Sequence, residues 1–339
     1  MRQRWLNRPD KSNWGEFGPD DQIGRMNLVT PERRLNAIRS VEHGLIFSLT
    51  LPLDYPGGSV LAQRRRPPRL FYGTRDGSYE FNYSLAQNCA CHTDVVSDDA
   101  VVLYTQYSTQ WDALSHVGQM FDVDGDGELE KTYYNGYQAG IHVRDPEADG
   151  SGRGAVELGI DRLAAAGVQG RGVMVDLHRA FGDQRVVVNY EQLMKVMSDQ
   201  GIVVDEGDFL CLHTGFADLV LAMGKNPDAE LLSRSCSVLD GRDDRLLDWI
   251  SQSGIAAICA DNFAVEQYPN PPGQGDRYSI LPLHNHCLFR IGVHLGELWH
   301  FRELQTWLRE HQRSTFLLTA PPLRLPGAVG SPVTPLATV

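Results

Sequence analysis

Short apolar runs, each bounded by glycine or charged residues, recur through the second half of the chain. They are VMVDL from Val173, FLCLHTG from Phe209, IAAICAD from Ile255 and FLLTAPPL from Phe316. Continuous apolar runs of this length are typical of strands that are buried on both faces. We therefore predict four central strands at these positions.

Apolar residues spaced by three and four positions predict helices over 189–200, 245–253 and 300–312. A further helix is expected near the start of the chain, where Thr30 can act as N-cap and Pro31 fits the first helical position. Gly44 is expected to close it. The apolar face of this helix would consist of Leu35, Ile38 and Val41.

The order of these elements indicates the fold class. Strands that alternate with helices predict a mixed α/β fold with some parallel pairing. The first 150 residues are richer in loops and aromatic residues. Neither an internal repeat nor a Ser/Gly linker interrupts the chain, so we expect a single domain over residues 1–339.

Composition and charge exclude several classes of partner. Hydrophobic residues make up 42% and charged residues 22%, as in ordinary globular proteins. A formal net charge of −12 argues against nucleic acid or anionic lipid as a partner, and the short basic run Arg64 to Arg66 is expected to be a solvated loop. The chain has no apolar run near the roughly 20 residues of a membrane span and no apolar stretch after its basic start. We expect a cytoplasmic protein without a membrane segment.

The six cysteines are too few for a disulfide framework in a chain of this size, and in the cytosol they would stay reduced. Cys211 and Cys259 lie inside predicted strands and are expected to be core thiols. Cys89 and Cys91, followed by His92, could be metal ligands, but a CxC pair without a second pair is weak evidence for a metal site.

The densest group of polar residues follows the apolar run VVLYT. It consists of Gln106, Ser108, Thr109, Gln110, Asp112, Ser115 and His116. At the end of a strand these side chains would project into a common pocket. Asp112, four residues before His116, could orient and charge the imidazole if the segment turns helically. The alternative is a buried polar network that fixes a loop.

A second polar cluster lies in LHNHCLFRIGVHLGELWHF, which carries His284, His286, His294, Glu297 and His300. His284 and Glu297 could reach a shared ion or water if the intervening turn folds back. His294 and His300 are better explained as a strand-face residue and a helix-start residue.

Three residues are candidates for substrate contact. Trp111 and Ser108 flank the Asp–His pair, and Asp261 ends a predicted strand, where ligands commonly meet α/β sheets. Core packing is the more frequent use of an aromatic such as Trp111, and Asp261 could equally cap the following turn.

The stretch FDVDGDGELE fits the first half of a calcium-binding loop through Asp122, Asp124, Asp126 and Gly127. The twelfth position, which usually holds a bidentate glutamate, is Tyr133. A plain acidic turn is the alternative.

Several segments, in order along the whole chain, resemble one protein family. WGEFGPDDQIGRMNLVTPER is similar to the opening pattern of the cyclase-like hydrolases, which include bacterial-type kynurenine formamidase and isatin hydrolase. QYSTQWDALSH occupies the place of the family's HxGTHxDxPxH signature, and GVHLGELWHFREL and APPLRLPGAVGSPVTPLA resemble its closing segments. STQWD, followed by a histidine and by Tyr134-Asn135-Gly136, resembles one branch of this family.

The resemblance implies a swivelling β/β/α fold and hydrolysis of amides or lactones with a bound divalent metal. By position, Asp112 corresponds to the signature's metal-binding aspartate, and His116 corresponds to the histidine that transfers protons. His284 and Glu297 would correspond to the late ligands.

The chain departs from the signature at Gln106 and Gln110, which stand where the family has two metal-binding histidines. A carboxamide oxygen is a poorer ligand for zinc or manganese than imidazole. Two outcomes stay open. Either a weaker site forms from Asp112, His284 and Glu297 with glutamine oxygens and water, or the protein uses no metal.

The function expected from these residues is hydrolysis of a small cyclic or linear amide, lactone or ester, in the manner of an arylformamidase. His116, oriented by Asp112, would activate water, while Gln106 and Gln110 donate to the oxyanion. The alternatives are a lyase or cyclase acting on a polyketide-like or aromatic intermediate, and a non-catalytic binding protein. The resemblance also implies a homo-oligomer, a dimer or tetramer, with a small molecule as the only other partner.

Overall fold

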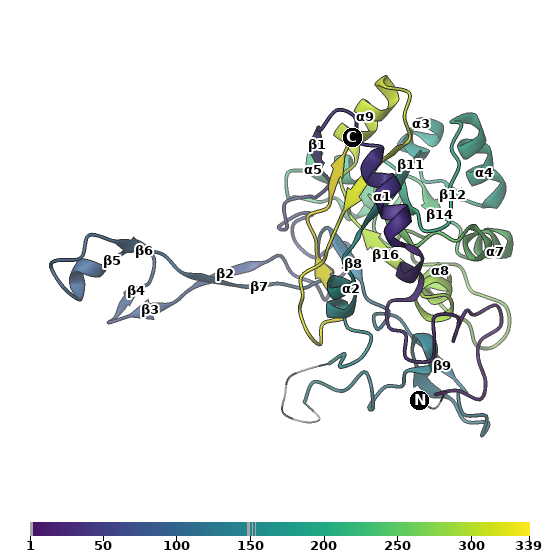
Figure 1. The fold of residues 1–339 in the computed structure, drawn as a ribbon, viewed down its shortest axis with the longest axis horizontal. Coiled ribbons are helices and arrows are strands. Elements are labelled where there is room, and N and C mark those ends of the chain that lie inside the picture. The colour runs from purple at the N-terminus through teal and green to yellow at the C-terminus, as the bar shows by residue number, and fades with distance from the viewer. Residues whose placement is uncertain (1–2, 148–149, 151, 153) are drawn as a thin grey trace.

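One large mixed sheet organises the fold (Figure 1). The computed structural model describes residues 3–147, 150, 152 and 154–339. Along the sheet the strands are β1 (Ile46–Ser48), β19 (Leu336–Thr338), β17 (Thr315–Thr319), β11 (Gln169–Asp176), β13 (Phe209–His213), β15 (Ala257–Ala260), β16 (His294–Glu297), β8 (Gln110–Asp112) and β18 (Gly330–Pro332). It therefore draws on nearly the whole length of the chain.

The centre of the sheet is parallel and its flanks are antiparallel. Strands β11, β13, β15 and β16 pair in parallel, whereas β17 joins β11 and β8 joins β16 in antiparallel fashion. All four predicted strands are confirmed, as β11, β13, β15 and β17, and the predicted parallel pairing is confirmed as well. Every residue of β13 and β15 is buried, which is why these strands read as continuous apolar runs.

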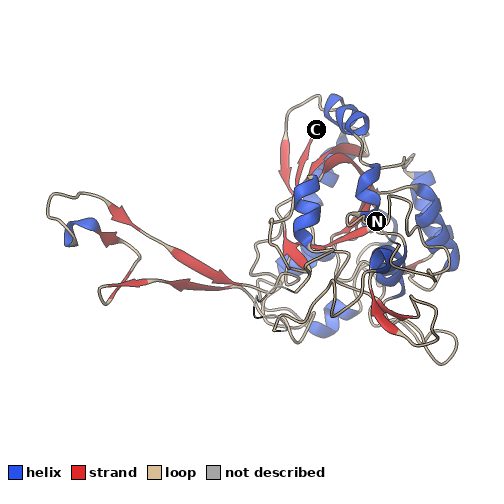
Figure 2. Ribbon diagram, turned by 60° about the horizontal axis from the view of Figure 1, so that its bottom comes forward, coloured by secondary structure: helices blue, strands red, loops and turns tan. Residues whose placement is uncertain are grey.

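Alternate residues of the central strands enter two separate cores. Val173, Leu210 and Ile258 pack with residues of α4 (Tyr190–Asp199) and α7 (Asp244–Ser253). On the other face, Met174 and Cys211 pack with residues of α2 (Ile160–Ala166) and α9 (Arg302–Glu310). Helices thus cover both faces of the sheet (Figure 2).

The expected helices are present as α1 (Pro31–Arg39), α4, α7 and α9. The shorter helices are α3 (Leu177–Phe181), α5 (Phe216–Ala222), α6 (Ala229–Ser233) and α8 (Pro282–His284). The Thr30 hydroxyl accepts a hydrogen bond from the Arg33 N–H, as an N-cap does. The predicted apolar face of α1 is wrong, because Leu35 is 49% and Ile38 43% exposed while Ala37 is the buried residue.

Outside the main sheet, two two-stranded sheets lie on the body, and a third one begins a projection from it. These are β9 (Gln119–Phe121) with β10 (Glu130–Thr132), β12 (Val187–Val188) with β14 (Val238–Leu239), and the ribbon β2 (Arg69–Tyr72) with β7 (Asp99–Val102). Among the described residues, no helix has both the length and the apolar character required to cross a bilayer.

Residues 69–102 form a long projection, here called the arm, that stands away from the body (Figures 1 and 2). The ribbon of β2 and β7 makes its stem, and the pairs β3 (Thr74–Arg75) with β4 (Ser78–Tyr79) and β5 (Tyr83–Ser84) with β6 (Val95–Val96) lie beyond it. The sequence indicated loops here but no projection.

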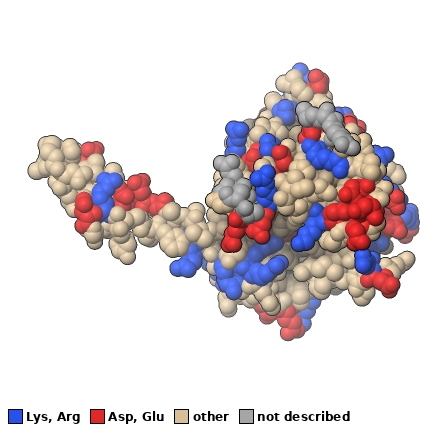
Figure 3. Space-filling model, turned by 90° about the horizontal axis from the view of Figure 1, so that it is seen from below, with Lys and Arg blue, Asp and Glu red and all other residues tan. Residues whose placement is uncertain are grey.

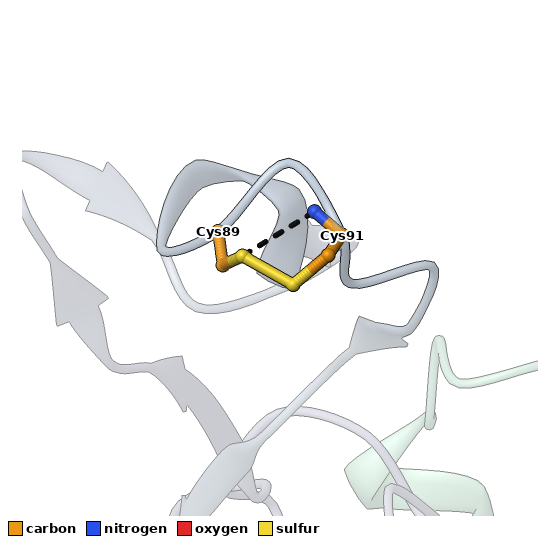
Figure 4. Close-up of a disulfide and its surroundings, with 2 residues drawn as sticks. All are labelled: Cys89 and Cys91. Carbon is orange, nitrogen blue, oxygen red and sulfur yellow. Dashed lines mark hydrogen bonds between the residues drawn. A yellow bond between two sulfur atoms is a disulfide. The ribbon is translucent and has the colours of Figure 1, made fainter.

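The distal part of the arm carries a disulfide between Cys89 and Cys91 (Figure 4). The expectation that all cysteines stay reduced is therefore wrong for this pair. Sulfurs bonded to each other cannot act as thiolate ligands, which argues against a metal site with His92 in this state. Cys211 and Cys259 are free and buried, as predicted.

Asn135 fastens the N-terminal segment to the body. Its side-chain amide donates to the carbonyls of Gly18 (3.0 Å), Pro19 (3.2 Å) and Asp21 (3.2 Å), and its Oδ1 accepts from the Gly15 N–H (2.9 Å). The backbone of Asn135 is left-handed, with φ of 56°. The opening motif and the Tyr134-Asn135-Gly136 motif thus contact each other directly.

We expect Asn135→Ala to lower the free energy of unfolding by about 2–4 kcal/mol, because it removes these hydrogen bonds and puts alanine, which tolerates the left-handed conformation less well than asparagine, at this position. Asn135→Gly removes the same hydrogen bonds without the backbone cost, so the decrease in the free energy of unfolding should be about 1 kcal/mol smaller. Urea unfolding measures both variants. Equal stability of the two would show that the backbone conformation contributes nothing.

Candidate functional site

The antiparallel pairing of β8 with β16 brings the two polar clusters of the sequence together. Gln110 lies opposite Glu297 in the register of these strands, and Trp111 lies opposite Gly296. His284, at the end of α8, reaches the same place from a third segment. The structure therefore places Asp112, His116, His284 and Glu297 side by side, although 187 residues separate Gln110 from Glu297.

Asp112 is the buried centre of the group. Its side chain is fully buried, and neither carboxylate oxygen has a hydrogen-bond partner in the described part of the chain. Oδ1 lies 3.8 Å from His116 Nε2, and Oδ2 lies 3.9 Å from His284 Nε2. Burial and the nearby Glu297 charge raise the pKa of Asp112 to about 8, against the opposing effects of His284 and Arg65.

His284 is held between two carboxylates. Its Nδ1 lies 2.8 Å from Glu266 Oε1 and its Nε2 lies 3.2 Å from Glu297 Oε1. Burial alone would lower the pKa of His284, but the hydrogen bonds to Glu266 and Glu297 outweigh it and raise the pKa to about 10. This imidazole is therefore a buried positive charge beside Asp112 and Glu297.

Glu266 is a site residue that sequence reasoning missed. It is fully buried and accepts hydrogen bonds from the backbone N–H groups of Leu283 and His284 as well as facing the His284 ring. Its signal in the sequence was a single acidic residue within NFAVEQY, shortly after the strand that ends at Asp261. No local pattern in the sequence links Glu266 to His284.

The Gln110 amide lies beside Glu297. Its Nε2 donates to Glu297 Oε2 (3.3 Å). With the amide rotated by 180°, Nε2 instead donates to the carbonyls of Ser108 (3.2 Å) and Gln106 (2.7 Å), and Oε1 turns toward Glu297. In both orientations the amide N–H groups of Gln110 are used within the protein, which removes support for its expected role as an oxyanion donor.

His116 lines the open side of the group. Burial, together with the positive charges of His284 and Arg65, lowers the pKa of His116 to about 3, so the ring is neutral at neutral pH. Its Nδ1 lies 3.4 Å from Gln106 Nε2, at the edge of hydrogen-bonding distance. Gln106 therefore faces the imidazole and can orient it.

A cavity of about 680 Å³ opens above these residues. Its walls are Val60, Leu61, Ala62, Gln63, Arg64, Arg65, His116, Val117, Phe263, Ala264, Tyr268, Leu281, His284 and Glu297. The expectation of a solvated basic loop is wrong for Arg65, which lies on the cavity wall and donates to the Gln106 carbonyl (2.6 Å). The sequence hypothesis required Asp112, His116, His284 and Glu297 to lie close together, and they do so in the structure.

The three residues expected to contact substrate lie elsewhere. Trp111 is fully buried in the core and donates its indole N–H to the Ala320 carbonyl (2.8 Å). Ser108 donates to the Pro52 carbonyl (3.4 Å), and Asp261 accepts hydrogen bonds from Thr214 and Gly215. None of them lines the cavity, because strand alternation and turn capping direct these side chains into the interior.

The residues present are compatible with a divalent cation. Asp112, His284 and Glu297 offer ligand atoms that all lie within 4.8 Å of one another. The Asp112 carboxylate, which has no hydrogen-bond partner among the described residues, is a group that a cation would satisfy. Glu266 would then hold the ring of His284 from behind, as carboxylates commonly do for metal-binding histidines.

The acidic turn at Asp122 is arranged as a turn stabilised by its own side chains. Asp122 accepts hydrogen bonds from the backbone N–H groups of Gly125 and Gly127. Glu130, rather than residue 133, is the fourth acidic side chain near Asp122, Asp124 and Asp126. Calcium binding at this exposed turn stays a prediction.

Comparison with known proteins identifies the family. Residues 47–267 match the family described as "Putative cyclase". A crystal structure described as a novel cyclase is 31% identical, with 97% of each chain covered and a TM-score of 0.76. No curated protein matches the chain in sequence.

Two isatin hydrolase structures share the fold at low identity. Isatin hydrolase A from Labrenzia aggregata, bound to benzyl benzoate, is 16% identical, with 87% of this chain and 93% of that chain covered and a TM-score of 0.55. An isatin hydrolase bound to the product analogue thioisatinate is 13% identical, with 91% and 99% covered and a TM-score of 0.52. The expected cyclase-like fold is thus confirmed, and the chain belongs to the cyclase family.

Proposed function

We propose that this protein is a hydrolase that adds water to the carbonyl carbon of a small amide, lactone or ester in the cavity beside His116. The observation that carries the proposal is the fully buried, unpartnered Asp112 carboxylate between His116 and His284, beneath that cavity. Burying a carboxylate without a partner costs stability, so its retention points to a chemical use.

His116 is suited to act as the general base. The neutral His116 ring can take a proton from the attacking water and return it to the leaving nitrogen or oxygen as the C–N or C–O bond breaks. With a pKa of about 3 the ring is a weak base while Asp112 keeps its proton. Once Asp112 is ionised, its carboxylate, 3.8 Å from Nε2, makes the ring more basic and stabilises the imidazolium that forms. Gln106, on the Nδ1 side, is a positioning residue for the ring.

Asp112, His284, Glu297 and the Gln110 oxygen are the residues that would hold a divalent cation, either zinc or manganese. When bound, such a cation polarises a substrate carbonyl and lowers the pKa of bound water. Arg65 adds a fixed positive charge to the wall of the same cavity, which favours the oxyanion that develops during water addition.

The cavity favours a substrate with a compact apolar body. Val60, Leu61, Phe263, Tyr268 and Leu281 supply apolar and aromatic walls, whereas Arg65, His116, His284 and Glu297 supply polar and charged groups. A site of this kind binds a ring or short chain by burial and fixes its reactive carbonyl by a few polar contacts. Cyclic amides and aryl esters are therefore the first compounds to assay.

We expect His116→Ala to lower kcat by about 10²–10⁴-fold on any substrate that the wild type hydrolyses, since a positioned base contributes about this much. Steady-state assays on cyclic amides, lactones and aryl esters, with ¹⁸O-labelled water, measure both the rate and the incorporation of water. Product without ¹⁸O would favour the lyase or cyclase alternative.

The control for this experiment is His311→Ala, because His311 is exposed and stacks on Trp307 outside the cavity. It should retain the wild-type rate. An unchanged rate and product profile in His116→Ala would reject catalysis at this site.

We expect the chelator-treated protein to bind one zinc or manganese ion at Asp112, His284 and Glu297, with release of protons. Asp112 holds a proton at neutral pH when its pKa is about 8, and a ligand must lose its proton to bind metal. Calorimetry in buffers of different ionisation enthalpy measures stoichiometry and proton release together.

Asp112→Asn should lower the number of cations bound per chain by one. It should also remove the proton that Asp112 releases when the cation binds. Asp199→Asn is the matched control, since Asp199 is an exposed carboxylate paired with Lys195. If Asp112→Asn binds the ion with wild-type affinity, Asp112 is not a ligand.

Stability should depend on pH through Asp112 in the chelator-treated protein. The folded carboxyl keeps its proton up to a pKa of about 8, whereas the unfolded one loses it near 3.8. The free energy of unfolding therefore falls as pH rises between these values, by up to about 1.4 kcal/mol per pH unit. Urea unfolding of wild type and Asp112→Asn at several pH values tests this pH dependence. Parallel stability profiles of the two proteins would contradict the prediction.

A further inference from the structure

The disulfide between Cys89 and Cys91 closes a very short loop. Only Ala90 separates the two cysteines, and the pair lies in the connection from β5, which ends at Ser84, to β6, which begins at Val95. The bond therefore joins no two strands of the arm. The stabilisation that a disulfide gives grows with the length of the loop that it closes, so this bond contributes little to the fold. Its presence calls for a chemical rather than a structural explanation.

The pair is open to solution. Every residue from 86 to 95 is exposed, whereas the four cysteines of the body are buried. The arm projects clear of the body in all three overall views (Figures 1, 2 and 3), so the body does not cover its outer end. Thiol–disulfide exchange requires a thiolate to reach a disulfide sulfur. A small thiol in solution can reach this bond, but the buried thiols of the same chain cannot.

The two sulfurs of the pair are not equivalent. The backbone N–H of Cys91 donates a hydrogen bond to Cys89 Sγ (3.4 Å), drawn as the dashed line in Figure 4. Such a hydrogen bond favours the thiolate form of Cys89 once the S–S bond breaks, which makes Cys89 the better leaving sulfur. The N–H of His92 donates to the Cys89 carbonyl (2.8 Å) and holds the turn closed, so the two cysteines remain neighbours after reduction.

We propose that Cys89 and Cys91 form a redox site that exchanges with low-molecular-weight thiols and their disulfides. A small thiolate attacks Cys91 Sγ and forms a mixed disulfide there, while the Cys89–Cys91 bond breaks and Cys89 leaves as a thiolate. A second small thiolate attacks the sulfur of the first one, so that a small disulfide departs and Cys91 leaves as a thiolate.

The electrons and protons of this exchange balance. The pair of cysteines gains two electrons, which the two small thiols lose, and the two protons of those thiols end on the cysteines. The reverse steps restore the Cys89–Cys91 bond and consume a small disulfide. The proposal does not depend on the proposed chemistry of the cavity.

Glutathione is the probe in the first experiment. The purified full-length protein is equilibrated with mixtures of reduced and oxidised glutathione, and the native protein is then labelled with iodoacetamide and its labels are counted by intact mass. We expect no label at the oxidising end and labels on both Cys89 and Cys91 at the reducing end, with the same curve reached from either direction. A label count that stays constant across the mixtures would overturn the proposal.

Two variants show where the labels are attached. Cys89→Ser/Cys91→Ser should take up no label in any mixture. Cys236→Ser is the matched control, since it removes a buried thiol of the body and should follow the wild-type curve. Circular dichroism verifies that each variant is folded. If the label count of the double variant still changes with the glutathione ratio, the exchange occurs elsewhere and the proposal is wrong.

Single variants test which sulfur leaves. Cys91→Ser keeps the backbone N–H that contacts Cys89 Sγ, whereas Cys89→Ser removes the sulfur that this N–H contacts. We expect Cys89 in the first variant to react with iodoacetamide at neutral pH about threefold or more faster than Cys91 in the second, because more of it is thiolate. Equal rates, or a faster reaction at Cys91, would overturn the assignment of Cys89 as the leaving sulfur.

Discussion

The candidate site depends on a carboxylate that the fold buries without a hydrogen bond. Taking an ionised carboxylate out of water costs several kcal/mol even after the surroundings relax. At Asp112 that cost is met by a proton, by the imidazolium of His284, or by a cation. Three carboxyl groups, those of Asp112, Glu266 and Glu297, converge on His284, so the imidazolium cannot neutralise all of them if Asp112 is ionised. The proton on Asp112 removes that excess negative charge.

Much of the fold was predictable from the sequence because the central strands are buried on both faces. Runs such as FLCLHTG and IAAICAD lack the apolar–polar alternation of surface strands. Helices α4 and α7 begin at the side-chain caps Asn189 and Asp243. The exposed face of α1 was not predictable. Leu35 and Ile38 have helical spacing, but spacing alone does not say whether anything in the fold covers them.

The sequence predicted most of the site residues but only some of the roles of those residues. The clusters around Asp112 and His284 were visible as dense polar segments, and their contact follows from the β8–β16 register, which no local pattern encodes. Glu266 and Arg65 were missed because each acts through a residue far away in sequence. Trp111 was misplaced because a one-residue difference along a strand reverses the direction of a side chain. Asp261 was misplaced because it follows its strand and accepts hydrogen bonds from the turn at Thr214 and Gly215.

The wall of the cavity and the root of the arm are consecutive in the chain. Residues 60–65 line the cavity, and β2 begins at Arg69, with Pro67 and Pro68 stiffening the connection between them. Arg65 sits at this junction with its guanidinium bonded to the Gln106 carbonyl. A change at this proline-containing junction that re-aims the arm would therefore also displace the Arg65 guanidinium, so the orientation of the projection and the charge on the cavity wall are mechanically coupled.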